Sequence, residues 1–202
     1  DTKRFAELHP GVRNVVGNWI GRLANNGENI RLIDAKGATV DKVRYATEGD
    51  WSRRTHGTLH GGHRGWIWKT LHDGGGYSLE LIQPSLSNNH GQNWHASLDK
   101  HGTPGRTNST LTANLPPMIL DVIHSPAVPR SNEPVTVSAR LLDESPNNTS
   151  AQLFYRLNGE TDYQQLTMSR ANAERFAATI PTQTNGQVVE FYLSATDNQG
   201  KT

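Results

Sequence analysis

The chain has 202 residues, with 20 Lys or Arg against 19 Asp or Glu, enough for one large domain or two small ones. It contains no cysteine, which excludes disulfides, thiolate zinc sites and cysteine nucleophiles, so any metal site would need histidine and carboxylate ligands. No run approaches the roughly 18 apolar residues that a membrane-spanning helix needs, so we expect no membrane segment.

The first ten residues predict one or two turns of helix that stop before Pro10, because Phe5 and Leu8 are spaced for one helical face. The chain begins without an initiator methionine and without the apolar region of a signal peptide. We therefore expect a fragment of a longer protein, from which any targeting signal has been lost.

Residues 28–45 predict a β-hairpin. Apolar and polar side chains alternate over residues 30–32, and the next residues, 34–37 (DAKG), are typical of a turn with glycine in the left-handed position. On the return strand Val40 is out of phase with the later apolar residues. A one-residue bulge near Asp41 or Lys42 would reconcile the two patterns.

The segment 51–72 (WSRRTHGTLHGGHRGWIWKTLH) has no Asp or Glu but four histidines, three tryptophans and four Lys or Arg. His60 and His63, with His56 four residues earlier, offer imidazoles at a spacing that suits zinc. The adjacent arginines repel a dication, and the segment supplies no carboxylate. We therefore expect neither a metal site nor a cofactor.

Two tryptophans of this segment, Trp66 and Trp68, are the stronger candidates for a binding surface. On an extended segment they project to the same face, where indoles can stack on sugar rings or bases and nearby cations can hold anionic groups. The alternative, which the usual burial of large aromatics favours, is that one or both close the sandwich core or pack the loop onto it. That burial is also expected for the other three tryptophans of the chain. The candidate ligand-binding residues are Trp66, Trp68, Arg64, His63, His60 and Lys69.

Residues 77–81 predict a later strand. Tyr77, Leu79 and Leu81 alternate with polar residues and are expected to face inward. Ser78 and Glu80 are then expected to face outward.

The sequence TANLPP at residues 112–117 predicts a boundary, because two prolines in series cannot continue a sheet ladder. Beyond it, six short strands separated by turn residues are typical of a β-sandwich. The inward faces are expected to be Val135, Val137, Ala139 and Leu141; Leu153, Tyr155 and Leu157; Phe176, Ala178 and Ile180; and Val189, Phe191, Leu193 and Ala195. We expect the domain to lack its last strand, because the chain ends after the turn at residues 198–200.

Two stretches of the first part resemble the lamin-tail domain, an immunoglobulin-like β-sandwich. The matching blocks are N-x-GE-x-I-x-L-x-D and V-D-x-V-x-Y within residues 21–45, and Gly-Tyr-Ser-Leu-Glu-Leu, Asn-Trp-x-x-Ser and Gly-Thr-Pro-Gly-x-x-Asn within residues 73–108. The second part resembles immunoglobulin-like and fibronectin type III modules, although Val189 stands where the latter usually carry Tyr. We therefore expect an all-β chain of two immunoglobulin-like β-sandwiches, residues 1–112 and 113–202.

The resemblance implies a non-catalytic module for adhesion, tethering or substrate presentation, of the kind appended to large bacterial proteins that are secreted or lie on the cell surface. The sequence contains no G-x-S-x-G, H-E-x-x-H or phosphate-loop pattern, so we expect no enzyme activity in this chain. Protein or polysaccharide partners are expected. Polyanion or nucleic-acid binding is the alternative, because residues 1–112 carry a net charge of +4 and the remainder −3.

Overall fold

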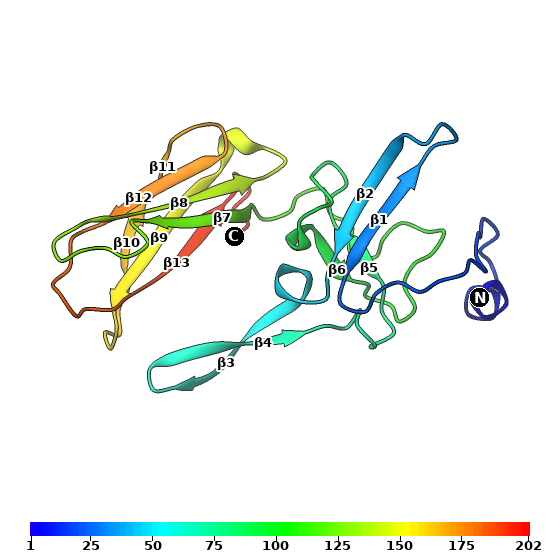
Figure 1. Cartoon of the computed structure of the whole chain (residues 1–202), viewed down its shortest axis with the longest axis horizontal. Coiled ribbons are helices and arrows are strands. Elements are labelled where there is room, and N and C mark those ends of the chain that lie inside the picture. Colours follow the sequence, from blue (N-terminus) through cyan, green and yellow to red (C-terminus); the bar gives the residue numbers. More distant parts are fainter. The chain divides into compact units, whose positions relative to one another are not determined.

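The computed structural model describes all residues, 1–202, and divides into two compact units, Asp1–Ala113 and Asn114–Thr202. Apart from one short helix and three 3-10 turns, the regular structure is made of strands in small antiparallel sheets (Figure 1). The prediction of an all-β chain is therefore confirmed. No helix is both long and apolar enough to cross a membrane.

The first unit opens with the helix α1 (Thr2–Leu8), as the sequence predicts. The Asp1 carboxylate caps it by accepting hydrogen bonds from the backbone nitrogens of Lys3 and Arg4, at 2.9 and 3.1 Å. Such a cap satisfies donors that have no partner inside the first turn. The helix ends two residues before Pro10.

Strands β1 (Glu28–Ile33) and β2 (Thr39–Tyr45) form the expected hairpin. The Asp34 carboxylate holds the turn by accepting from the backbone nitrogens of Lys36 and Ala38, at 2.8 and 2.9 Å. Leu32 pairs with Asp41 and Ile33 with Thr39, so Val40 is the extra residue. The predicted bulge is confirmed one position before Asp41.

Two more strand pairs complete the first unit. After the turn η1 (Gly49–Trp51), β3 (Arg53–His60) and β4 (His63–Lys69) pair as a second hairpin. Strand β5 (Leu79–Leu81) pairs with β6 (Trp94–Ala96), which follows the turn η2 (Gly91–Asn93). The unit therefore consists of three separate two-stranded sheets.

Glu80 corrects the predicted orientation of residues 77–81, because its side chain is buried while Leu79 and Leu81 are only partly buried. Its carboxylate accepts hydrogen bonds from the hydroxyls of Thr103 (2.5 Å) and Ser109 (2.7 Å) and from the Thr110 backbone nitrogen (3.2 Å). Burial raises the pKa of Glu80, but these hydrogen bonds favour the carboxylate and bring the pKa below its ordinary value. Glu80 thus fastens the loop 103–110 to β5.

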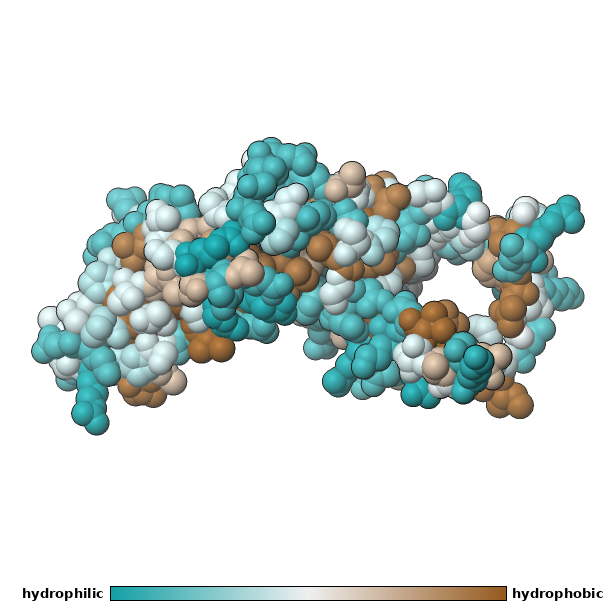
Figure 2. Space-filling view, turned by 90° about the horizontal axis from the view of Figure 1, so that it is seen from above, coloured by the Kyte–Doolittle hydropathy of each residue, from teal (hydrophilic) through white to brown (hydrophobic).

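The interior of the first unit is polar. Its buried side chains include those of Glu80, Gln83 and Asn93, whereas every buried hydrophobic side chain of the protein lies in the second unit. Val16, Trp19 and Ile20 are exposed in the segment before β1, and hydrophobic residues of this unit form part of the surface in Figure 2. The expected burial of Trp19 is wrong, since 68% of its surface is accessible.

The second unit has two sheets. Their strands are β7 (Met118–Ser125), β8 (Val135–Leu142), β9 (Ser150–Leu157), β10 (Gln164–Thr167), β11 (Ser169–Arg170), β12 (Arg175–Ile180) and β13 (Val189–Thr196), with a 3-10 turn, η3 (Pro146–Asn148), before β9. The sheet orders are β10-β9-β13 and β11-β12-β8-β7. One apolar cluster draws residues from both sheets, among them Val137, Leu153, Phe176 and Ala195. The alternation of inward and outward side chains that the sequence predicts is confirmed for β8, β9, β12 and β13.

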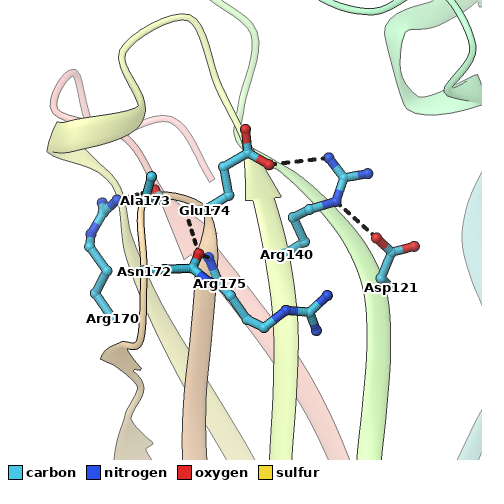
Figure 3. Close-up of polar contacts among 7 residues, drawn as sticks. All are labelled: Asp121, Arg140, Arg170, Asn172, Ala173, Glu174 and Arg175. Atoms are coloured by element: carbon cyan, nitrogen blue, oxygen red, sulfur yellow. Dashed lines mark hydrogen bonds and ion pairs between the residues drawn. The ribbon is translucent and has the colours of Figure 1, made fainter.

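An ion-pair network crosses the four-stranded sheet of the second unit. Figure 3 shows the Arg140 guanidinium of β8 between the carboxylates of Asp121 and Glu174, at 2.8 and 3.4 Å. Asp121 lies where β7 gains an extra residue relative to β8, and its φ of 50° is in the left-handed region that Asp tolerates better than most residues. The network thus holds the two strands together at their bulge.

Candidate binding surface

The segment 51–72 forms an extended hairpin rather than a loop. Gly61 and Gly62 make a two-residue turn with φ values of 57° and 84°, and His60 pairs with His63 across it. Positive φ at both turn positions matches the right-handed twist of paired strands and is easiest for glycine. A Gly-Gly pair between two extended segments is the sequence signal that could have predicted this hairpin.

The β3–β4 hairpin reaches out from the other strands of the first unit (Figure 1). Every residue of β4 is exposed, and only Thr55 and Gly57 of β3 are partly covered. A two-stranded hairpin with both faces in water gains little from burial. Its side chains are therefore available for contact with another molecule.

One face of the hairpin carries the aromatic side chains and is here called the indole face: Arg54, His56, Leu59, Arg64, Trp66 and Trp68. These residues share a face because side chains alternate along a strand and the register pairs His56 with Trp66, Arg54 with Trp68 and Leu59 with Arg64. Strand β3 has a one-residue bulge, where Gly57 and Thr58 together lie opposite Gly65 of β4. There a Cβ on Gly57 would stand 3.2 Å from the Gly65 carbonyl oxygen.

Trp66 is the centre of this face. The His56 ring lies 4.4 Å from the Trp66 ring, and the Arg54 guanidinium lies 4.7 Å from its centroid, a cation–π distance. Trp66 remains 47% exposed and Trp68 45% exposed. Both indoles are thus oriented by the hairpin while much of their surface stays in water, so the alternative that they close the core is wrong.

The positive charges of the hairpin have no acidic partner within the chain. Arg53, Arg54, Arg64 and Lys69 form no ion pair within the chain. A cation without an internal partner keeps its hydrogen-bond donors available for a carboxylate, sulfate or phosphate. The hairpin therefore combines flat apolar surface with donors for anionic groups.

The six residues predicted as ligand-binding divide between the two faces. Arg64, Trp66 and Trp68 lie together on the indole face, whereas His60, His63 and Lys69 lie on the opposite face. The sequence-based set omitted Arg54 and His56, which contact Trp66 from the neighbouring strand. Counting residues along both strands from the Gly-Gly turn predicts which residues pair across the hairpin. The bulge displaces this count by one residue before it reaches Arg54 and His56.

The remaining tryptophans have other roles. Trp51 and Trp94 stack on each other with centroids 5.8 Å apart, and the Trp94 indole nitrogen donates to the Asn88 carbonyl oxygen at 2.8 Å. Both are partly buried and belong to the framework of the first unit. No group of three or more His, Cys, Asp or Glu side chains has an arrangement that could hold a metal ion.

No family model matches the sequence, and no curated protein matches it.

Proposed function

We propose that the chain is a non-catalytic binding module of a larger protein, secreted or on the cell surface, that holds its ligand on the indole face. The observation that carries this proposal is the pair Trp66 and Trp68, half-exposed on one strand beside cations that form no ion pair within the chain. Indoles usually bury most of their area, so two on an exposed hairpin favour a recognition role. Adhesion, tethering or substrate presentation would each use such a surface.

The ligand class that fits the indole face best is an acidic polysaccharide. Sugar rings stack on exposed indoles, and Trp66 and Trp68 stand about 6.7 Å apart along the strand. Arg64 and Arg54 supply planar forks of donors, which match carboxylate and sulfate oxygens in a bidentate arrangement. A neutral sugar would use the indoles and leave the guanidinium groups unpaired.

Single-stranded nucleic acid is the second candidate. Its bases also stack on aromatic side chains, and the first unit carries 14 Lys or Arg against 10 Asp or Glu. This excess of four is small for a polyanion-binding domain. The proposal therefore favours the polysaccharide and leaves nucleic acid as a measurable outcome.

The fold assignment of the two units is part of the same proposal. For the second unit, an immunoglobulin-like sandwich is supported by two antiparallel sheets around one apolar cluster. For the first, the resemblance to the lamin-tail domain rests on the sequence blocks around the β1–β2 hairpin and β5.

The direct test is retention in native affinity gels that contain polygalacturonate, heparin or neutral dextran. We expect the protein to be retarded by the acidic polysaccharides, and the double variant Trp66→Ala/Trp68→Ala to migrate freely. Trp19→Ala is the matched control, because this tryptophan is 68% exposed but lies outside the hairpin. Equal retardation of the double variant and the wild type would contradict the proposal.

A second experiment separates the two ligand classes. Arg64→Gln should weaken retention by the acidic polysaccharide, while Arg31→Gln, an exposed arginine of β1, should not. Titration with single-stranded DNA at several salt concentrations then reports polyanion binding, whose affinity falls steeply with salt. Tighter binding of DNA than of polygalacturonate at physiological salt would mean that the ligand is nucleic acid and not an acidic polysaccharide.

A further inference from the structure

The second unit has a pocket at one end of its two sheets, where β8 and β13 begin and β7 and β12 end. Its volume of about 440 Å³ falls within the roughly 300–1,000 Å³ of small-molecule sites. The strands contribute His124, Val135, Ile180, Val189 and Phe191 to its wall. The pocket therefore draws on both sheets and lies at one end of the apolar core.

The apolar part of the wall is accessible. Val137 is fully buried, but Val135, two residues before it on the same face of β8, is only partly buried. Val189 and Phe191 of β13 are also partly buried, although both pack against the core. The His124 ring meets the Phe191 ring edge-on, with centroids 6.2 Å apart, and so orients it. Apolar surface that stays accessible inside a pocket favours a hydrophobic ligand group over water.

Two loops complete the wall, one between β7 and β8 and the other between β12 and β13. The Asn132 backbone nitrogen donates to the Gln183 carbonyl oxygen at 3.3 Å, which joins the two loops. In the first loop, the Arg130 backbone nitrogen donates to the Glu133 carboxylate at 2.9 Å, and the Glu133 backbone nitrogen donates to the Arg130 carbonyl oxygen at 3.1 Å. A wall held in this way before a ligand arrives lowers the entropic cost of binding.

Arg130 is the exposed arginine of this wall. Its guanidinium forms no ion pair or hydrogen bond within the chain, whereas those of Arg140 and Arg156 each pair with a carboxylate at 2.8 Å. Glu133 is the only carboxylate of the wall, and the loop already uses one of its oxygens. A guanidinium is a planar fork of donors that matches the two oxygens of a carboxylate. The wall thus combines accessible apolar surface with one arginine that can take an anion.

We propose that this pocket binds a small apolar carboxylic acid, with its hydrophobic group against Phe191 and Val189 and its carboxylate paired with the Arg130 guanidinium. A neutral analogue keeps the apolar contact and loses the ion pair, and an amine meets a like charge. The pocket lies entirely in the second unit, so this site does not depend on the function proposed for the indole face.

The test compares three probes with the same phenyl group: phenylacetate, phenylacetamide and phenethylamine. Binding to the whole chain at neutral pH is followed through the methyl NMR signals of Val135 and Val189. We expect saturable shifts with phenylacetate and an affinity about fivefold lower for phenylacetamide, the size of an ion pair that stays in contact with water. Equal affinities for these two probes, tighter binding of phenethylamine, or no saturable shift would overturn the proposal.

Further measurements assign the two parts of the site. Arg130→Gln should bind phenylacetate no better than phenylacetamide. Arg175→Gln is the matched control and should keep the preference, because this arginine of β12 also forms no ion pair but does not line the pocket. A preference that survives in Arg130→Gln would overturn the pairing with Arg130. Acetate lacks the ring and should give no saturable shift, so acetate binding as tight as that of phenylacetate would contradict the apolar part.

Discussion

In the second unit, the least accessible side chains are apolar, among them Val137, Leu153 and Phe176, and they pack between two sheets. In the first unit, the least accessible side chains are polar, such as Glu80 and Asn93, and each has several hydrogen-bond partners. Apolar packing is non-directional and follows the buried area, whereas a hydrogen-bonded interior depends on every partner being present. The second unit is thus held by an apolar core, while the interior of the first depends on its hydrogen bonds.

The largest effect is expected from a cavity in the second unit. Leu153→Ala removes a side chain with 0% exposure and should lower the free energy of unfolding by about 2–5 kcal/mol. Leu98→Ala makes the same change at a position of the first unit that is 67% exposed and should cost less than about 0.5 kcal/mol. Denaturant unfolding followed by circular dichroism measures both, and equal costs would remove the contrast between the units.

A smaller loss is expected from the polar interior of the first unit. The Asn93 side chain accepts from the Gln83 backbone nitrogen at 2.8 Å and donates to the carbonyl oxygens of Gln83 and Ser87. Asn93→Ala leaves these groups unpaired and should cost about 1–3 kcal/mol, while Asn89→Ala, at an exposed position, should be neutral. All five tryptophans lie in the first unit, so tryptophan fluorescence follows its unfolding alone.

Acid should act on the first unit through Glu80. Its pKa is depressed in the folded protein, so the stability it contributes is complete above the ordinary glutamate pKa of about 4.3 and is lost as the pH falls toward the folded-state value. Glu80→Gln should remove this part of the acid sensitivity. We expect the tryptophan-detected unfolding midpoint of the wild type, but not of Glu80→Gln, to fall over this range. Parallel pH profiles would argue against Glu80 as the cause.

The smallest effect on stability is expected at the indole face. Trp66 and Trp68 are half-exposed and lie on a hairpin that pairs with no other strand, so Trp66→Ala/Trp68→Ala should change the free energy of unfolding by less than about 0.5 kcal/mol. The same variant is expected to lose polysaccharide retention. A large loss of stability would mean that the tryptophans support the fold after all.

Much of the second unit could be predicted from the sequence, because its strands alternate apolar and polar residues and the apolar faces are covered. The helix near the N-terminus and the bulge at Val40 could also be predicted from the sequence, since both depend on neighbouring residues. Glu80 was not, because its partners lie 23 to 30 residues further along the chain. Alternation shows which residues share a face, but it does not show which face is covered.

The candidate site was predicted only in part for the same reason. Spacing placed Trp66 and Trp68 on one face, but their exposure depends on whether another element packs against the hairpin. Arg54 joins them only through the cross-strand register, which a bulge displaces by one residue. The pocket beside Arg130 has no local signal at all, because its wall comes from three separate segments of the second unit.

The bulge at Gly57 and Thr58 allows the shape of the hairpin to be changed without changing its chemistry. A bulge bends a strand and increases its twist. Deleting Thr58 would pair Gly57 with Gly65 alone and leave His56 opposite Trp66 and Leu59 opposite Arg64. The same aromatic and basic groups would then be presented on a straighter ribbon, and comparing the two forms would show whether the ligand follows a curved or a flat surface.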